Sequence, residues 1–378
     1  MRNFTFKGLF LTAVFMLLGC FSIQAANDDL ITKQITIKLD EAGTLPDKIG
    51  SSRMYKITNL KIVGKIDGTD WDMIRMMAGR DYHGDVTKGN LSVLDLSEAK
   101  IVNGGGYYYY YDYDGWSYIY GTYYDKIGDY AFKGCSGLTS LTLPATITTI
   151  GKYAFEDCTG LTSLNLPAGI TSIGRRAFGG CSGLTSLTLP AGITSISDEA
   201  FYLCSGLTSL TLPAGITSIG SAAFCGCSGL TSLALPAGIT EIGGSAFFAC
   251  SGLTSLTLPA GITEIGYQAF SYCSGLTSIY VYSEKVPKIG SDVFYYVDKK
   301  KCTVYVPKGT YADYRSSNFG YFENIVEFDA TGIDKTTTST DVEEVSRYSV
   351  NGQRLAVPVK GFNIVKYSDG SARKVVVK

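Results

Sequence analysis

Apolar and polar residues follow one another along the middle of this chain in a pattern that repeats every 23 residues. One copy reads I-G-x-x-A-F-x-x-C-S-G-L-T-S-L-T-L-P-A-G-I-T-S. Its phenylalanine and its cysteine recur without a slip, at Phe132, Phe155, Phe178, Phe201, Phe224, Phe247 and Phe270, and at Cys135, Cys158, Cys181, Cys204, Cys227, Cys250 and Cys273. A fixed period of about 20–50 residues indicates a repeat architecture.

Each unit contains a short predicted strand. Leu187 and Leu189 alternate with Ser186 and Thr188, so the leucines point inward and the hydroxyls outward. Pro190 ends the strand, because proline cannot donate to a ladder. With the L-x-x-L-x-L signature, the period predicts a leucine-rich-repeat solenoid. We expect a continuous parallel β ladder through all seven full units, with short helical or irregular returns.

Atypical segments flank the solenoid on both sides. The N-terminal side contains copies of L-x-x-L-x-L at 57–62 and 91–96 and an expected helix at 70–78. We interpret this segment as an irregular cap. A cap is expected, because an uncovered terminal unit would expose its core and its strand edge. The predicted organisation is a signal peptide at 1–26, an N-terminal capping region with atypical repeats at 27–102, a Tyr-rich insert at 103–126, the repeat solenoid at 127–300, a C-terminal cap at 301–330, a linker at 331–341 and a small β tail at 342–378.

The first residues predict export. Arg2 and Lys7 accompany an apolar run at 9–18 that is too short to span a bilayer. Two cleavage sites remain open. The small residues that end at Ala26 suit ordinary signal peptidase, whereas Leu17-Leu18-Gly19-Cys20 resembles a lipobox that would leave Cys20 lipidated. Either route places the chain at the cell surface or in the extracellular space, and the second anchors it to the outer membrane.

The seven cysteines of the repeat are predicted to be unpaired, buried side chains. Equivalent positions of stacked units lie about 4.8 Å apart with parallel Cβ directions, whereas a disulfide needs converging Cβ atoms about 3.5–4.5 Å apart. Free cysteine behaves as a small hydrophobe. Cys225 stands outside the repeated column, two residues before Cys227, so we expect its thiol to be more accessible.

Composition argues against catalysis. The 378 residues include one histidine, His83, which has no recognisable partner and is expected in a surface turn. The formal net charge of −1 gives no basis for binding nucleic acid. Residues 112–115 resemble the start of a calcium loop, but Gly121 stands where an EF-hand requires its final acid. We therefore predict a protein that is not an enzyme and has no cofactor and no metal.

Two surfaces remain as candidates for binding. The first is the outward side of the strands, a nearly uncharged hydroxyl lattice that is either a docking sheet or solvent-facing residues copied with the repeat. It comprises Ser140, Thr142, Ser163, Asn165, Ser186, Thr188, Ser209, Thr211, Ser232, Ala234, Ser255, Thr257, Ser278 and Tyr280. With almost no charged or aromatic residue, this face offers few candidates for a binding hot spot.

The second surface is the Tyr-rich insert, where aromatic residues crowd into one segment. These are Tyr107, Tyr108, Tyr109, Tyr110, Tyr111, Tyr113, Trp116, Tyr118, Tyr120, Tyr123 and Tyr124. Tyrosine and tryptophan supply large contact areas at low entropic cost, so the insert is the predicted ligand site. The alternative is a decoration or a loop folded onto the first units. Because the insert lies outside the repeat pattern, its replacement by serine is expected to leave folding nearly unchanged.

The unit IGxxAFxxCSGLTSLTLP resembles the BspA-like leucine-rich repeats of bacterial surface proteins, over residues 127–327. Residues 35–102, with GTDWDMIRMMAG and LSVLDLSEAKIV, look like the segment that precedes such repeats in Bacteroides-type bacteria. The ending, with NGQRL and KVVVK, is similar to short C-terminal tails of exported proteins, sorting tails included. The resemblance implies adhesion to host extracellular or bacterial surface proteins. The alternative function is carbohydrate binding through the Tyr-rich insert.

Overall fold

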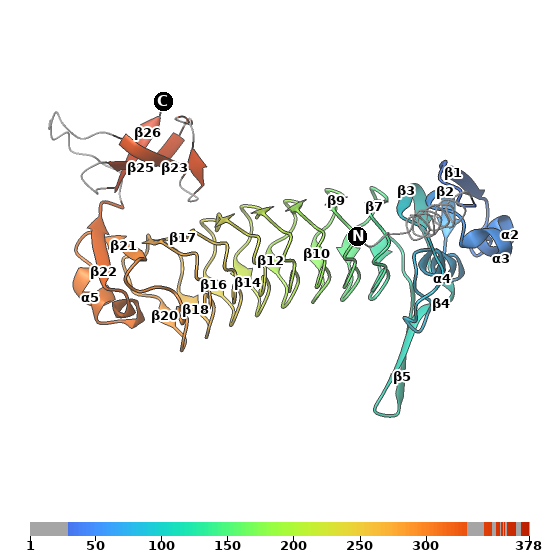
Figure 1. Cartoon of the computed structure of the whole chain (residues 1–378), viewed down its shortest axis with the longest axis horizontal. Coiled ribbons are helices and arrows are strands. Elements are labelled where there is room, and N and C mark those ends of the chain that lie inside the picture. Colours follow the sequence, from blue (N-terminus) through green and yellow to red (C-terminus); the bar gives the residue numbers. More distant parts are fainter. Residues whose placement is uncertain are drawn as a thin grey trace, which may run out of the picture.

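The computed structural model describes residues 29–330 and, with gaps, residues 344–377. Figure 1 shows a long row of stacked coils, with additional elements at both ends and a hairpin that projects beside the N-terminal units. The predicted signal peptide, with Cys20, and the linker at 331–341 lie outside the described residues.

The first strand of each unit lies on the face that carries the hydroxyl lattice, here called the strand face. These strands are β7 (Ser140–Thr142), β9 (Ser163–Asn165), β11 (Ser186–Thr188), β13 (Ser209–Thr211), β15 (Ser232–Leu233), β17 (Ser255–Leu258), β19 (Ser278–Val281) and β21 (Thr303–Pro307). Neighbours are parallel and pair at equivalent positions of the repeat, as Leu187 does with Leu210. The solenoid predicted from the period is confirmed.

The ladder on the strand face is not continuous, so that expectation is wrong. Pairing ends at β13 and starts again at β15, which leaves two sheets. Strand β15 keeps only two residues, Ser232–Leu233, which leaves little backbone to bond to β13. The stack itself continues across this gap, because the rings of Phe201 and Phe224 remain 5.2 Å apart. Backbone bonds elsewhere also join these two units: Ile219 pairs with Ile242, and the N–H of Gly229 donates to the carbonyl oxygen of Ser205 at 3.1 Å.

A second strand of two residues follows each turn after the proline. These strands are β6 (Lys126–Ile127), β8 (Thr149–Ile150), β10 (Ser172–Ile173), β12 (Ser195–Ile196), β14 (Ser218–Ile219), β16 (Glu241–Ile242), β18 (Glu264–Ile265) and β20 (Lys288–Ile289). They form two parallel sheets, separated between β10 and β12. Each unit then runs through a return segment without regular structure, from the glycine after the second strand to the cysteine of the repeat. The outer side of these segments is here called the return face.

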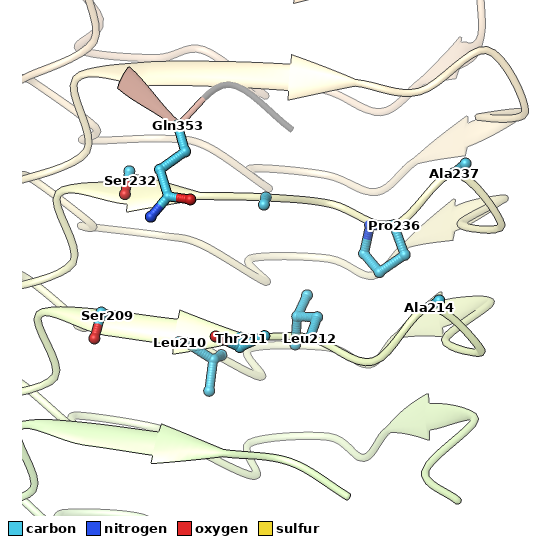
Figure 2. A pocket seen from close by; sticks show the side chains of 10 residues that line it. Ser209, Leu210, Thr211, Leu212, Ala214, Ser232, Pro236, Ala237 and Gln353 are labelled. Atoms are coloured by element: carbon cyan, nitrogen blue, oxygen red, sulfur yellow. The ribbon is translucent and has the colours of Figure 1, made fainter. Parts of the chain in front are cut away.

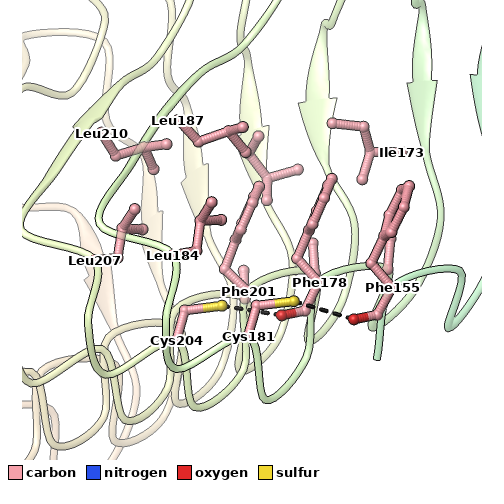
Figure 3. Close-up of a cluster of buried hydrophobic side chains, with 14 of the residues drawn as sticks. Phe155, Ile173, Phe178, Cys181, Leu184, Leu187, Phe201, Cys204, Leu207 and Leu210 are labelled. Atoms are coloured by element: carbon pink, nitrogen blue, oxygen red, sulfur yellow. Dashed lines mark hydrogen bonds between the residues drawn. The ribbon is translucent and has the colours of Figure 1, made fainter. Parts of the chain in front are cut away.

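Phenylalanines fill the interior of the solenoid as one stack. Phe155, Phe178 and Phe201 lie nearly parallel, with centroids 5.2–5.4 Å apart (Figure 3). Beside them, the Sγ atoms of Cys181 and Cys204 donate to the carbonyl oxygens of Phe155 and Phe178 at 3.0 Å. Six of the seven thiols of the repeat make this bond to the preceding unit, which favours cysteine over an apolar side chain in this column.

All nine cysteines among the described residues are free, as predicted for those of the repeat. Burial raises the pKa of these thiols, that of Cys204 to about 12. Cys225 is half-buried, and burial raises its pKa as well.

We therefore predict that native protein at pH 8 reacts slowly with a thiol reagent such as dithionitrobenzoate, and at Cys225 before the cysteines of the repeat. Thiolate is the reactive form, so the rate should rise with pH towards the raised pKa. Unfolded, unreduced protein should titrate at least the nine thiols of the described residues. A count of one or two would show that the cysteines form disulfides.

The N-terminal cap extends the same parallel sheet and adds helices. It comprises β1 (Ile35–Leu39), α2 (Leu45–Ile49), α3 (Ser51–Met54), β2 (Asn59–Ile66), α4 (Gly68–Met77) and β3 (Val93–Ile101). A capping box between Asp67 and Asp70 starts α4. Two buried side chains of α4 then bond the first unit: Trp71 donates to the carbonyl oxygen of Ala131 at 3.0 Å, and Arg75 to that of Tyr130 at 2.8 Å.

The C-terminal end of the solenoid is closed by α5 (Tyr311–Arg315), the 3-10 helix η1 (Asn318–Tyr321) and β22 (Asn324–Phe328). Tyr314, Phe319 and Phe322 are buried there, and the ring of Phe322 lies 5.1 Å from that of Phe294 in the last unit. Strand β22 pairs in parallel with β21. Aromatic side chains thus cover the end of the phenylalanine stack.

Beyond the cap, four strands form an antiparallel sheet, in the order β24-β23-β25-β26. They are β23 (Glu344–Ser349), β24 (Arg354–Leu355), β25 (Gly361–Tyr367) and β26 (Ala372–Val377). Ile364 of this sheet packs in one buried cluster with Tyr280, Tyr305 and Phe328. The C-terminal sheet therefore rests on the strand face of the last units (Figure 1).

Candidate functional site

The Tyr-rich insert is an antiparallel hairpin of β4 (Gly104–Tyr113) and β5 (Trp116–Thr122). Asp114 and Gly115 form its two-residue turn, with positive φ angles of 51° and 78°. Such a turn suits the right-handed twist of a hairpin, and Asp-Gly is one of its favoured sequences. That dipeptide between two aromatic runs is the sequence signal that could have identified the hairpin.

The base of the hairpin belongs to the core of the molecule. Tyr108 is fully buried, and its hydroxyl donates to the carbonyl oxygen of Asp129 at 3.0 Å. Tyr109 is buried as well and stacks on Tyr130 with centroids 4.7 Å apart. Burial raises the pKa of the Tyr108 phenol. Neither ring can contact a ligand directly. Their burial contradicts the premise that the whole insert lies outside the core, so for these two residues we expect replacement to destabilise the fold.

One face of the hairpin is entirely aromatic. Strand pairing matches Tyr109 with Tyr120, Tyr111 with Tyr118, and Tyr113 with Trp116, and the period of two puts all six side chains on the same face. Tyr111 and Tyr118 stack at 5.1 Å. We call these six residues the aromatic face of the hairpin.

The outer half of the aromatic face is open to solvent. Trp116 is 72% exposed and Tyr113 70%, and Tyr118 is also exposed, whereas Tyr111 and Tyr120 are half-buried. The hairpin stands away from the solenoid (Figure 1). Exposed rings on a firmly packed base are preorganised, so little entropy would be lost if a ligand bound to them.

The remaining residues of the predicted site lie beside the aromatic face. Tyr107, Tyr123 and Tyr124 are exposed near the base of the hairpin. Tyr110 is on the opposite face, where its hydroxyl donates to the Asp112 carboxylate at 2.6 Å. Hydrogen bonds from Tyr110 and then Ser117 lower the pKa of that carboxyl group. Among the described residues, no group of three or more His, Cys, Asp or Glu side chains is placed to hold a metal ion.

His83 lies in a turn next to the hairpin. Its backbone N–H donates to the Asp81 carboxylate at 2.9 Å, and its ring meets that of Tyr110 edge-on at 5.1 Å. The side chain is exposed. Its surroundings are those of a surface turn, as expected from the sequence.

The hydroxyl lattice of the strand face is open only in part. Its residues in β7 to β13 are exposed, those of the later strands are half-buried, and Thr257 and Tyr280 are buried. Gln353, beside β24, reaches over a depression of about 300 Å³ between β13 and β15 (Figure 2). The prediction that Thr257 and Tyr280 face solvent is therefore wrong, because the C-terminal sheet lies over this end.

Sequence reasoning missed the return face, where the repeat varies most. The positions that flank each buried phenylalanine point outward, and their residues change along the solenoid. They are charged residues and tyrosines in the first units, mostly small residues in the middle units and tyrosines in the last units. The late tyrosines are Tyr267, Tyr272, Tyr295 and Tyr296, all exposed. Aligning the copies column by column would have revealed them, since tyrosine replaces glycine, alanine or serine there.

Two columns of the return face have a left-handed backbone. The residue two positions before each phenylalanine, such as Tyr130 or Gln268, has a positive φ in every unit and is never glycine. The residue two positions after each phenylalanine has φ between 56° and 75° in every unit, and it is glycine at 134, 180 and 226. Tyr272 and Tyr296 occupy the same column with φ of 59° and 61°. A left-handed conformation costs a residue with a side chain about 1–2 kcal/mol. The two tyrosines share this cost with Asp157, Leu203 and Ala249 of the same column.

The charged residues at the other end of the return face neutralise one another. Glu156 pairs with Lys133 at 2.8 Å and with Arg176 at 2.7 Å, and Glu199 pairs with Arg176 and Arg175. The Glu156 side chain is almost fully buried in this network. These charges therefore hold neighbouring units together and leave little net field for a charged ligand.

Comparison with known proteins identifies the repeat. The sequence profile of the BspA type Leucine rich repeat region matches residues 107–206 and 194–326 in six copies, together more than half of the chain. The chain belongs to the BspA-type leucine-rich-repeat family. This confirms the resemblance drawn from the repeated unit. A search of curated proteins found no match.

Solved structures of leucine-rich-repeat proteins resemble this chain in part. The T. pallidum leucine-rich-repeat protein TpLRR is 27% identical, with 44% of this chain and 66% of that chain covered and a TM-score of 0.32. A leucine-rich repeat protein from Bacteroides ovatus is 19% identical (78% and 92% covered, TM-score 0.24), and a leucine rich cell surface protein from Faecalibacterium prausnitzii is 20% identical (64% and 89% covered, TM-score 0.26).

Proposed function

We propose that this BspA-type chain is an exported cell-surface protein that binds host extracellular proteins or the surface proteins of other bacteria. Family membership suggests a role in protein interaction, and leucine-rich-repeat proteins are generally non-enzymatic scaffolds. The relative from F. prausnitzii is described as a cell surface protein. No helix in the described part of the chain is long and apolar enough to cross a membrane.

The aromatic face of the hairpin carries this proposal. Its outer rings, Tyr113, Trp116 and Tyr118, are exposed on a strand pair whose base is locked into the core through Tyr108. Protein-binding hot spots are enriched in tryptophan and tyrosine, and exposed apolar area of this kind commonly marks an interaction site. The open strand face offers only small hydroxyl side chains, so the hairpin is the stronger candidate.

We predict that replacing Tyr113, Trp116 and Tyr118 together by serine weakens protein binding at least about tenfold, since truncating even one hot-spot residue costs about 2 kcal/mol. The measurement is surface plasmon resonance of the purified mature chain against immobilised extracellular-matrix proteins and bacterial surface extracts. Folding should be unaffected, because all three side chains are exposed.

The matched control is Ile119→Ser, which removes an exposed apolar side chain from the opposite face of the same hairpin. It should retain parental affinity. If the triple variant bound with parental affinity, the aromatic face would not be the protein-binding site. Competition by soluble sugars for the same rings would instead favour the alternative, a carbohydrate-binding hairpin.

A further inference from the structure

We propose a second binding site, independent of the hairpin, for a neutral glycan at the C-terminal end of the return face. A pocket of about 310 Å³ lies there between the last unit and η1, lined by Asp292, Val293, Phe294, Tyr295, Asn318 and Tyr321. This volume is at the lower end of the range of about 300–1,000 Å³ typical of ligand pockets. It suits a compact group such as a sugar ring better than an extended peptide.

Aromatic rings continue from the pocket over the neighbouring units. Tyr295 meets Tyr296 edge-on at 4.6 Å, Tyr296 stacks on Tyr272 at 4.5 Å, and Tyr272 lies 5.1 Å from Phe248. The electron-rich face of an aromatic ring attracts weakly positive C–H groups, and a pyranose presents such groups on one side. Tyr272 and Tyr296 cover one face of each other, so a sugar would contact the exposed remainder of the row, which includes Tyr295. A row of partly exposed rings beside one pocket fits a chain of sugars better than a single small molecule.

Polar groups at the pocket can bond sugar hydroxyls. The Asp292 carboxylate is exposed and makes no hydrogen bond or ion pair within the described part of the chain. Asn318 donates through Nδ2 to the carbonyl oxygen of Gly290 at 3.2 Å, which fixes the amide and leaves Oδ1 to accept. Tyr321 is held by its own bond to the carbonyl oxygen of Val297 at 3.0 Å. Fixed acceptors beside exposed rings favour hydroxyl-rich ligands.

Charge selects the class of glycan. The free carboxylate of Asp292 would repel a uronic or sialic acid at the pocket. Two of the three neighbouring lysines are engaged elsewhere, Lys301 with Asp298 at 3.5 Å and Lys299 with Glu323 at 3.9 Å. The site is therefore suited to neutral sugars.

The backbone at the two stacked tyrosines makes glycine a clean test substitution. Tyr272 and Tyr296 occupy the left-handed column where glycine stands at 134, 180 and 226. Asp157, Leu203 and Ala249 stand in the same column of other units, so the conformation does not by itself mark a functional site. It does allow both rings to be removed by glycine without straining the backbone.

The test is the affinity of the mature chain for soluble neutral polysaccharides, with a mannan, a mixed-linkage β-glucan and a xylan as probes and polygalacturonate as the acidic comparison. Affinity electrophoresis and isothermal titration calorimetry give the dissociation constants. We expect binding to at least one neutral probe and none to polygalacturonate. The Tyr272→Gly/Tyr296→Gly variant should lose at least tenfold in affinity with an equal or higher melting temperature.

The matched control is Leu203→Gly, which relieves the same backbone conformation at the same column with an exposed side chain. It should keep parental affinity. A second variant, Asp292→Ala, should weaken binding without affecting the melting temperature. The hairpin triple variant should bind glycan normally, which separates this proposal from the proposed protein binding.

Three results would overturn the glycan site. One is failure of every neutral probe to bind the parental chain. Another is unchanged affinity of the Tyr272→Gly/Tyr296→Gly variant in spite of normal folding. The third is an equal loss in the Leu203→Gly control, which would trace the effect to the backbone of the solenoid and not to the rings.

Discussion

Replacing Leu187 by aspartate is expected to lower the free energy of unfolding of the solenoid by at least about 4 kcal/mol. The side chain is 4% exposed and pairs across β11 and β13 with Leu210. Removing a buried leucine side chain costs about 2–5 kcal/mol through lost contacts and a cavity. A carboxylate without a partner at the same place adds a desolvation penalty. Because each unit is stabilised by its neighbours, the damage should spread to adjacent units.

The measurement is urea unfolding followed by far-ultraviolet circular dichroism, with Ser186→Asp as the matched control. Ser186 is the next residue of the same strand and is exposed, so the same charge there should change stability by no more than about 0.5 kcal/mol. Parental stability of the Leu187 variant, or equal losses in both variants, would show that the inward assignment of the leucines is wrong.

Replacing Tyr108 by alanine is expected to cost about 3–5 kcal/mol, the range for a buried aromatic side chain. Tyr108 packs at 6.1 Å from Trp71, and its hydroxyl bonds the carbonyl oxygen of Asp129 in the first unit. Its loss would leave both a cavity and an unbonded acceptor. The hairpin should detach from the cap, so binding should fall together with stability.

The control is Tyr113→Ala, five residues further along β4 and 70% exposed. It should leave the melting temperature within about 2 °C and weaken binding alone, since surface substitutions rarely exceed about 0.5 kcal/mol. If Tyr113→Ala destabilised the protein as much as Tyr108→Ala, the whole hairpin would be part of the cap. Ligand contact would then have to be sought elsewhere.

The two candidate surfaces lie at opposite ends of one solenoid. The hairpin stacks on Tyr130 of the first unit, whereas the glycan pocket is lined by Asp292 and η1. At about 4.8 Å per unit, the seven steps between these positions correspond to about 34 Å. A rigid solenoid would hold two such sites at a fixed separation, which would allow a protein and a glycan to be bound together.

The sequence alone determined the architecture of the units. The repeat places an equivalent of Leu187, Phe201 and Cys204 in every 23-residue unit. In a stack of units, equivalent residues lie next to one another. The alternation of apolar and polar residues within the unit then indicates which side chains point inward. The unpaired cysteines followed from the same geometry, because equal spacing and parallel Cβ directions exclude disulfides. The copies of L-x-x-L-x-L before the repeat likewise identified strands β2 and β3.

Only the tertiary structure decided which aromatic residues are accessible. Tyr108 and Tyr113 lie on one strand in the same kind of sequence, yet one is buried against α4 and the first unit while the other faces solvent. Tyr280 has the outward place of Thr188 in its unit but is covered by Ile364 of the C-terminal sheet. The pocket beside Tyr295 forms only where η1 meets the last return segment. Such contacts join parts of the chain outside the repeat register, and local periodicity carries no information about them.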